Sequence, residues 1–186
     1  MTNRALQEAN SGQTKAHQKN KHRYVVWLRD AAIVLVIITA VIAWQTRDML
    51  SSDGSVIIAQ QNLVSLEGEV HPMLSTEQAN LVYFFAPWCQ ICSLSIGNLA
   101  YLSPEKVNVV VIALDYSSIE AVEAFVNEHG VKAPVYLGNP ELKSQFQIQG
   151  YPSYYMIDKD GKIQGRNFGY STAIGLKLRE AFGAWP

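Results

Sequence analysis

The most uniformly apolar stretch of the chain lies near its N-terminus, where Ala31–Thr46 contains sixteen residues and no charge. A helix drawn through it has β-branched residues on every face and no polar stripe, so it belongs either in a membrane or in a protein core. Sixteen helical residues span about 24 Å, and Tyr24–Leu28 extends them across the ~30 Å hydrocarbon core of a bilayer. Trp27 and Trp44 lie where an aromatic belt is expected. Residues 24–46 are therefore predicted to form one transmembrane helix.

After residue 61 the pattern changes to short apolar runs that alternate with amphipathic stretches. Asn80–Ala86 and Val107–Leu114 are almost continuously apolar, as strands buried on both faces are. Ser117–His129 is predicted to be a helix with a capping box at Ser117 and Glu120. The remaining predicted elements are an edge strand or hairpin in Ser55–Leu66, helices over Cys89–Leu102, Pro140–Phe146 and Thr172–Phe182 (the last two capped by Asn139 and Ser171), a strand at Pro134–Leu137, and a hairpin of Ser153–Ile157 with Lys162–Phe168.

The order of these elements, β-α-β-α-β-β-α, predicts the fold class. It places a parallel half before an antiparallel half and so predicts an α/β domain, a three-layer α/β/α sandwich with a mixed central sheet. The predicted organisation is a basic cytoplasmic tail (residues 1–23), the transmembrane helix (24–46), a linker (47–61) and the α/β domain (62–186).

Charge is distributed unevenly about the apolar helix. Residues 1–30 have six basic and two acidic side chains, a net charge of +4, whereas residues 47–186 have nine basic and fourteen acidic ones, a net charge of −5. The positive-inside rule then places the N-terminus in the cytoplasm and exports the domain. A signal peptide cleaved near Val41–Ala43 is the alternative, with an unusually long charged region before it. The overall net charge of −1 provides no field that would attract nucleic acid.

The two cysteines of the chain, Cys89 and Cys92, follow directly after a predicted buried strand. Pro87 and Trp88 lie in the turn, and a helix is predicted to begin at the first cysteine. Backbone N–H groups and the helix dipole there favour the thiolate form of Cys89. Cys92 lies one turn further along, on the same face and within disulfide reach. The arrangement predicts a redox pair in which Cys89 attacks a substrate disulfide and Cys92 resolves the mixed disulfide.

Zinc binding, a purely structural disulfide and calcium binding fit these motifs less well. A zinc site needs two further ligands, and the spacing of His71 and His129 does not supply them. A structural disulfide across so short a loop removes little entropy from the unfolded chain. Asp158–Gly161 opens like a calcium loop but lacks the later acidic ligand, so it is predicted to be the turn of the hairpin. No metal, nucleotide or flavin cofactor is predicted.

Ala86–Cys92, with the sequence APWCQIC behind an apolar strand, resembles the active site of the thioredoxin superfamily. Gly150–Ser153, which contains Pro152 sixty residues after Cys92, resembles the cis-proline site of that family. With a single N-terminal anchor and an exported domain, the chain is similar to the membrane-tethered TlpA/ResA-like branch of bacterial thiol-disulfide oxidoreductases. The resemblance covers about Asn62–Phe182.

The resemblance implies a thioredoxin-like domain in which Cys89 is the nucleophile and Cys92 the resolving thiol. It implies that Pro87 and Trp88 shape and shield the pair, and that Tyr151 and Pro152 line the substrate groove. The backbone of Tyr151 would bind a peptide, and the Tyr151–Pro152 bond would be cis, which X–Pro bonds adopt at low cost. The redox-active disulfide would take the place of a cofactor.

The activity implied is that of a protein-disulfide oxidoreductase anchored in the bacterial inner membrane, with its catalytic domain in the periplasm. Its partners would be exported proteins with thiols or disulfides, and a membrane protein that supplies or accepts electrons. By analogy the expected direction is that of a reductase. A disulfide-donating oxidase and a non-catalytic, thiol-dependent binding module or chaperone are the alternatives.

Two positions depart from thioredoxin itself. Thioredoxin has a buried carboxylate six residues before its first cysteine, where this chain has Tyr83. Asp115, at the end of the next predicted strand, is then the candidate proton acceptor for Cys92, with a turn residue as the alternative. Gln90 and Ile91 replace the Gly-Pro pair of thioredoxin, so the reduction potential cannot be carried over from that protein.

Overall fold

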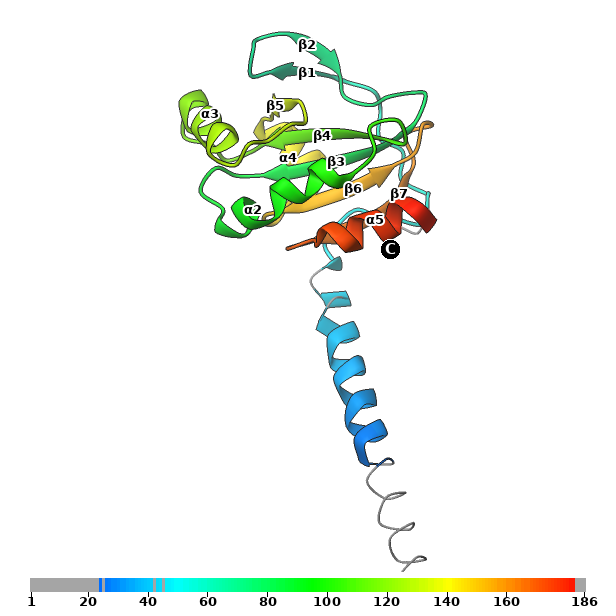
Figure 1. The fold of residues 1–186 in the computed structure, drawn as a ribbon. Coiled ribbons are helices and arrows are strands. Elements are labelled where there is room, and N and C mark those ends of the chain that lie inside the picture. The colour runs from blue at the N-terminus through cyan, green and yellow to red at the C-terminus, as the bar shows by residue number, and fades with distance from the viewer. Residues whose placement is uncertain (1–23, 25, 42, 45, 183–186) are drawn as a thin grey trace, which may run out of the picture. The chain divides into compact units, whose positions relative to one another are not determined.

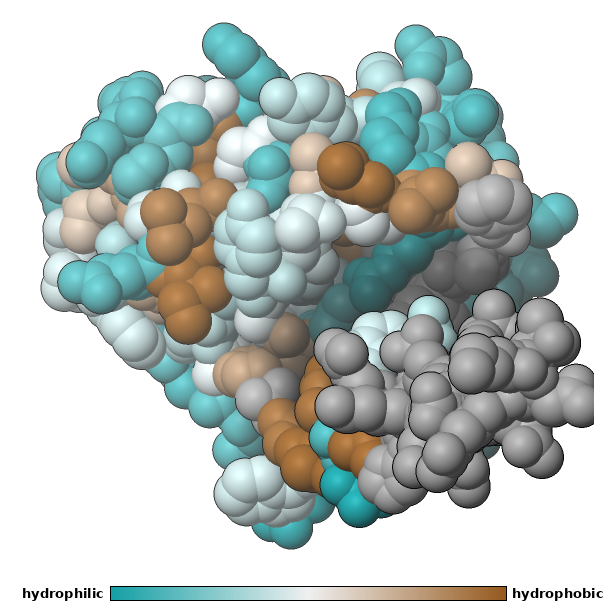
Figure 2. Space-filling view, turned by 60° about the horizontal axis from the view of Figure 1, so that its bottom comes forward, coloured by the Kyte–Doolittle hydropathy of each residue, from teal (hydrophilic) through white to brown (hydrophobic). Residues whose placement is uncertain are grey.

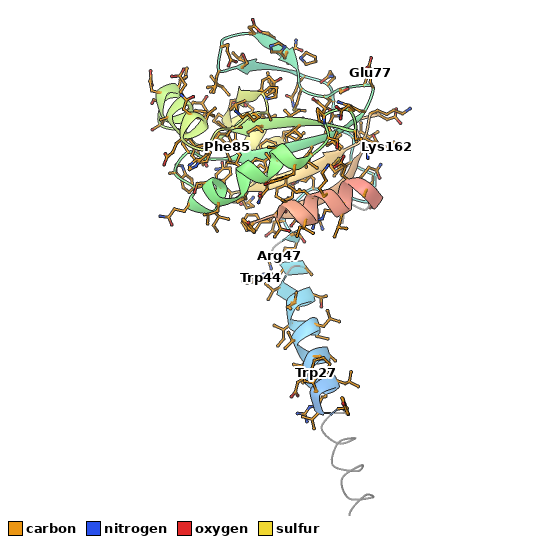
Figure 3. The ribbon with its side chains drawn as sticks, in the orientation of Figure 1. Trp27, Trp44, Arg47, Glu77, Phe85 and Lys162 are labelled. Carbon is orange, nitrogen blue, oxygen red and sulfur yellow. A yellow bond between two sulfur atoms is a disulfide. The ribbon has the colours of Figure 1, made fainter. Side chains whose placement is uncertain are left out.

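The computed structural model describes residues 24, 26–41, 43–44 and 46–182, and divides the chain into the units Met1–Gln45 and Thr46–Pro186. The described positions of residues 24–46 are helical (Figure 1). Trp27 and Trp44 lie near the two ends of this helix (Figure 3). Within the described ranges, no helix combines the length and the apolar character needed to cross a membrane. The predicted tail, residues 1–23, lies outside the described residues.

The second unit is built on one seven-stranded sheet in the order β2-β1-β5-β4-β3-β6-β7. β3 pairs in parallel with β4 and antiparallel with β6, and β4 pairs in parallel with β5. This mixture confirms the predicted mixed sheet. The strands are β1 (Asn62–Ser65), β2 (Val70–Pro72), β3 (Ala79–Phe85), β4 (Val107–Ala113), β5 (Val135–Leu137), β6 (Ser153–Ile157) and β7 (Ile163–Phe168).

The helices cover both faces of the sheet (Figure 1). They are α2 (Gln90–Ser95), the 3-10 helix η1 (Ile96–Tyr101), α3 (Ile119–Glu128), α4 (Pro140–Gln145) and α5 (Ala173–Phe182). Alternate side chains of β3 show which helix lies on which face. The hydroxyl of Tyr83 reaches Ser95 of α2, and the Phe85 ring stacks on Phe125 of α3, whereas the Phe84 ring packs on Phe146 at the end of α4. Because adjacent strand residues point to opposite faces, α2 and α3 share one face and α4 covers the other.

The strand predictions are confirmed closely, but three helix predictions need correction. α3 is capped by Ser118 rather than Ser117, because Ser118 has the extended backbone and its Oγ accepts from the Ala121 backbone N–H. At α5, Thr172 rather than Ser171 accepts, from the Gly175 N–H. The single helix predicted over Cys89–Leu102 is instead α2 followed by η1. Ser95, whose hydroxyl bonds back to the Cys92 carbonyl, and Gly97 both weaken an α-helix at this junction.

The segment before β3 also differs from its prediction. β1 lies within the expected Ser55–Leu66, but β2, its partner in the hairpin, lies beyond that range. Ile57 forms an isolated bridge with Lys162. Met49 and Ile58, within the predicted linker, are buried in the core. Arg166 donates to the carbonyls of Met49 and Leu50, so this segment is bound to the domain.

Asn80, fully buried at the start of β3, provides a test of this packing. Its amide accepts from the Ser75 N–H (2.6 Å) and from Asn108 Nδ2 (2.9 Å), and donates to the carbonyls of Ser75 and Gln78. Asn80→Ala leaves buried polar groups unpaired at about 1–3 kcal/mol each, so we expect the free energy of unfolding to fall by about 3 kcal/mol.

Urea denaturation of the full chain in detergent measures this effect. Glu77→Ala is the control, because Glu77 is exposed on the same loop (Figure 3), and it should shift stability by less than about 0.5 kcal/mol. Equal effects of the two substitutions would contradict the structural role assigned to Asn80.

Candidate active site

The two cysteines lie at the N-terminus of α2 and are joined by a disulfide, with 5.2 Å between their Cα atoms. Cys89 is the N-cap residue, and its sulfur accepts a hydrogen bond from the Cys92 N–H at 3.1 Å. A helix N-terminus and a backbone donor both stabilise negative charge on a sulfur. Cys92 is fully enclosed, whereas Cys89 retains 7% exposure. A partner therefore meets Cys89 first.

The turn that presents Cys89 follows from the end of β3. Phe85 is the last residue of that strand (Figure 3) and is buried against Phe125, which holds the strand end in place. The Cys89 N–H then donates to the Ala86 carbonyl at 3.0 Å, closing a tight turn through Pro87 and Trp88. The helix can begin only after this turn, so the first cysteine lies at its cap.

Trp88 and Tyr151, predicted as separate parts of the site, lie together. Their rings meet edge to face with 5.7 Å between centroids. The Tyr151–Pro152 peptide bond is cis, as the resemblance implied. The Trp88 side chain is 65% exposed, so it forms part of the outer surface beside Cys89.

A cavity of about 510 Å³ lies beside Cys89, between the start of α2 and the face of α3. The sequence did not indicate this space, because it depends on how α3 packs beside α2. Besides Pro87, Trp88 and Cys89, the cavity is lined by Gln90, Ser93, Ser117, Ala121, Ala124, Phe125, Glu128 and His129. Ser117, Ala121 and Ala124 have small side chains, which leave this space open next to Cys89. Figure 2 shows several separate apolar patches among hydrophilic side chains on one face of the molecule.

Asp115 lies close to the site, although its contacts differ from the predicted ones. Its backbone carbonyl accepts from Trp88 Nε1 at 3.0 Å, and its Oδ2 accepts from the Tyr151 hydroxyl at 2.9 Å and from Lys143 Nζ at 2.5 Å. The bond from Lys143 lowers the pKa of this carboxyl below its usual value. A carboxylate with a lowered pKa is a poorer proton acceptor, so the geometry does not favour the suggested role toward Cys92.

Lys143 was absent from the sequence-based site. It lies in α4, 28 residues from Asp115, and no motif connects the two. The sheet topology brings the two residues together. β4 and β5 are adjacent parallel strands, so Asp115 after β4 and α4 after β5 lie at the same edge of the sheet. Asp115 lies just after β4, at the start of the segment that leads to α3, and has a left-handed conformation with φ +48°.

Beneath Cys92 the site is neutral. Tyr83 is buried, its hydroxyl bonds to Ser95 Oγ at 2.8 Å, and its ring stacks on Tyr154. Burial raises the pKa of Tyr83 far above its ordinary value, so the hydroxyl stays protonated. Ser95 Oγ in turn donates to the Cys92 carbonyl at 3.5 Å. Two hydroxyls thus occupy the region where thioredoxin has a carboxylate.

The arrangement is suited to thiol–disulfide exchange: Cys89 lies at a helix N-terminus and borders a cavity, and Cys92 is fully buried behind it. Among the side chains that the structure describes, no cluster of three or more His, Cys, Asp or Glu is placed to hold a metal ion.

Known proteins with related sequences are consistent with this chemistry. The model of the Redoxin family matches residues 62–180. The thioredoxin-like protein YneN of Bacillus subtilis is 24% identical over 157 residues, which cover 78% of this chain and 91% of YneN. The thiol-disulfide oxidoreductase ResA of Bacillus anthracis is 31% identical over 98 residues, which cover 50% of this chain and 57% of ResA. The match thus spans little more than half of ResA.

Solved structures agree on the fold. StoA from Bacillus subtilis superposes with a TM-score of 0.58 at 23% identity, covering 64% of this chain and 95% of StoA. A secreted disulfide oxidoreductase of Mycobacterium tuberculosis gives a TM-score of 0.58 at 18% identity, covering 66% of this chain and 96% of its own. These matches confirm the predicted thioredoxin-like fold, and ResA is named as an oxidoreductase of the predicted class. The chain belongs to the Redoxin family, as a TlpA/ResA-like member of the thioredoxin superfamily.

Proposed function

We propose that this chain is a membrane-anchored protein-disulfide reductase whose redox centre is Cys89–Cys92. The observation that supports the proposal most strongly is that the two sulfurs differ in position and in burial. Cys89 caps a helix, retains 7% exposure and borders an open cavity, whereas Cys92 is fully buried behind it. A nucleophile must reach its substrate, and a resolving thiol must reach only the nucleophile.

The reaction begins from the reduced pair. The Cys89 thiolate attacks one sulfur of a substrate disulfide, that S–S bond breaks, and the departing substrate thiolate takes up a proton. Cys92 then loses its proton and attacks the Cys89 sulfur, which releases the second substrate thiol. Two electrons pass to the substrate, and the protein is left with the Cys89–Cys92 disulfide. A partner with a dithiol must supply two electrons for the next turnover.

Pro87, Trp88, Tyr151 and Pro152 are proposed to shape the surface on which the substrate lies. The contact between Trp88 and Tyr151 supports this, since it joins the cysteine turn to the cis-proline loop. Exported proteins with disulfides are the proposed substrates, and a membrane dithiol protein is the proposed electron donor.

The anchor is proposed for residues 24–46, as a single inner-membrane span with a cytoplasmic N-terminus and a periplasmic domain. Large apolar side chains are exposed along its described part, including Ile33, Val34, Leu35, Val36, Ile37, Ile38 and Val41. Water is an unfavourable environment for so many consecutive apolar groups, and lipid is a favourable one. The basic residues before the helix support the orientation.

We expect Cys89→Ser to abolish the reduction of insulin by the full chain in detergent, lowering the rate at least about 100-fold toward background. Cys92→Ala is the matched variant: it keeps the nucleophile but cannot resolve, so it should accumulate a mixed disulfide visible on non-reducing gels. Mass spectrometry of such adducts from cells identifies the clients. Wild-type turnover by Cys89→Ser would refute the assignment of the nucleophile.

The direction of electron flow is tested by the reduction potential of the Cys89–Cys92 couple. For a reductase we expect roughly −250 mV or lower, near the range of thioredoxin and below that of the oxidising envelope. Equilibration with glutathione or dithiothreitol buffers, followed by thiol labelling, measures it. A value near −120 mV would instead support the disulfide-donating oxidase.

The anchor is tested by alkaline carbonate extraction of membranes and by a C-terminal alkaline phosphatase fusion. We expect the uncleaved chain in the membrane pellet and an active fusion. Val36→Arg with Ile37→Arg should release the chain, since each arginine costs about 3 kcal/mol at the centre of a membrane helix. A shortened, soluble wild-type chain would indicate a cleaved signal peptide.

A further inference from the structure

We propose that Lys143 is a positioning residue of the redox centre, which pairs with Asp115 and thereby keeps that carboxylate from opposing the thiolate form of Cys89. The inference deepens the proposed function and rests on it. Three interactions on one aspartate support it, and each reaches a different element of the site.

The contacts around Asp115 connect α4, the cis-proline loop and the cysteine turn. Lys143 Nζ and the Tyr151 hydroxyl both donate to the same oxygen, Oδ2, at 2.5 and 2.9 Å. The backbone carbonyl of Asp115 accepts from Trp88 Nε1, and Trp88 directly precedes Cys89. The ammonium of Lys143 also lies 5.8 Å from the centre of the Tyr151 ring. Lys143 thus acts on the turn through Asp115 and its two aromatic neighbours.

The charge of Asp115 makes this pairing matter for the chemistry. An ionised carboxylate beside the turn raises the cost of placing a second negative charge on the Cys89 sulfur. Lys143 offsets that charge locally, so the helix N-terminus can stabilise the thiolate without opposition. The side chains of Lys143 and Asp115 are 35% and 38% exposed, so the effect is screened in part by water and is modest in size.

The other charged or titratable groups near Cys89 are identified, so their contributions can be held constant. Tyr151 from the cis-proline loop contacts Asp115, and Glu128 of α3 and the C-cap residue His129 line the cavity beside Cys89. All three are left unchanged in the variants below.

Opposite effects of two substitutions provide the test. Lys143→Met leaves Asp115 uncompensated. Asp115→Asn removes the charge while its amide oxygen can still accept from Tyr151 and Lys143, and asparagine tolerates the positive φ of this position. The measurement is the rate of iodoacetamide alkylation of Cys89 in the reduced full chain in detergent, between pH 5 and 9, with the modified residue identified by mass spectrometry.

At pH 7 we expect Lys143→Met to slow alkylation roughly threefold and Asp115→Asn to accelerate it by a similar factor, with the pH profiles displaced in opposite directions. The double variant should return to within about 1.5-fold of wild type, because both charges are gone. Lys143→Arg should retain the wild-type profile. Lys159→Met, the same loss of charge at the exposed β6–β7 turn, is the matched control and should leave it unchanged.

A packing role alone predicts a different pattern. The inference would be overturned by any of three results. These are equal pH profiles of alkylation in all variants, shifts of the two single variants in the same direction, or slower alkylation of the double variant than of Lys143→Met. Failure of the proposed function is distinguishable, because it would appear as wild-type insulin reduction by Cys89→Ser or as a reduction potential typical of a disulfide-donating oxidase, neither of which depends on the alkylation rates of the Lys143 and Asp115 variants.

Discussion

The structure of the site depends on the point where β3 ends and the first turn of α2 begins. β3 is paired on both sides and buried along nearly its whole length, so its last residue is fixed in space. The turn that follows has no freedom to move Cys89 away from the helix N-terminus, where the Cys92 N–H meets its sulfur. The rigid strand β3 thus fixes the position of Cys89 relative to the N-terminus of α2. The cis-proline loop and α3 only complete the surroundings of that position.

Much of this could be predicted from the chain alone, for identifiable reasons. β3 and β4 are apolar on both faces, which is a strong pattern, and the structure places them within one residue of their predicted ends. The cysteine turn and Tyr151–Pro152 are local motifs, so they too were visible in the sequence. The sequence did not show that Ser118 rather than Ser117 caps α3, because both are serines and only backbone geometry distinguishes them.

The features that sequence analysis missed are those that depend on tertiary contacts. Lys143 follows β5 and pairs with Asp115, which follows the adjacent strand β4. The cavity beside Cys89 exists because α3 packs next to α2. Tyr83 was recognised as a departure, but its partner Ser95 could be found only once β3 and α2 were placed together. Pairing of hydroxyls under Cys92 shows how a buried polar position is satisfied without a charge.

The enclosure of Cys92 has a consequence for the order of events in a catalytic cycle. If only one sulfur of the pair can be reached from outside, the protein that donates electrons and the protein that receives them must both react with Cys89. They cannot be bound there at the same moment, so they must alternate. A cycle of this kind has ping-pong kinetics, in which each partner acts as a competitive inhibitor of the other when in excess. The surface around one atom must therefore accept two different proteins in turn, which limits how closely it can be fitted to either.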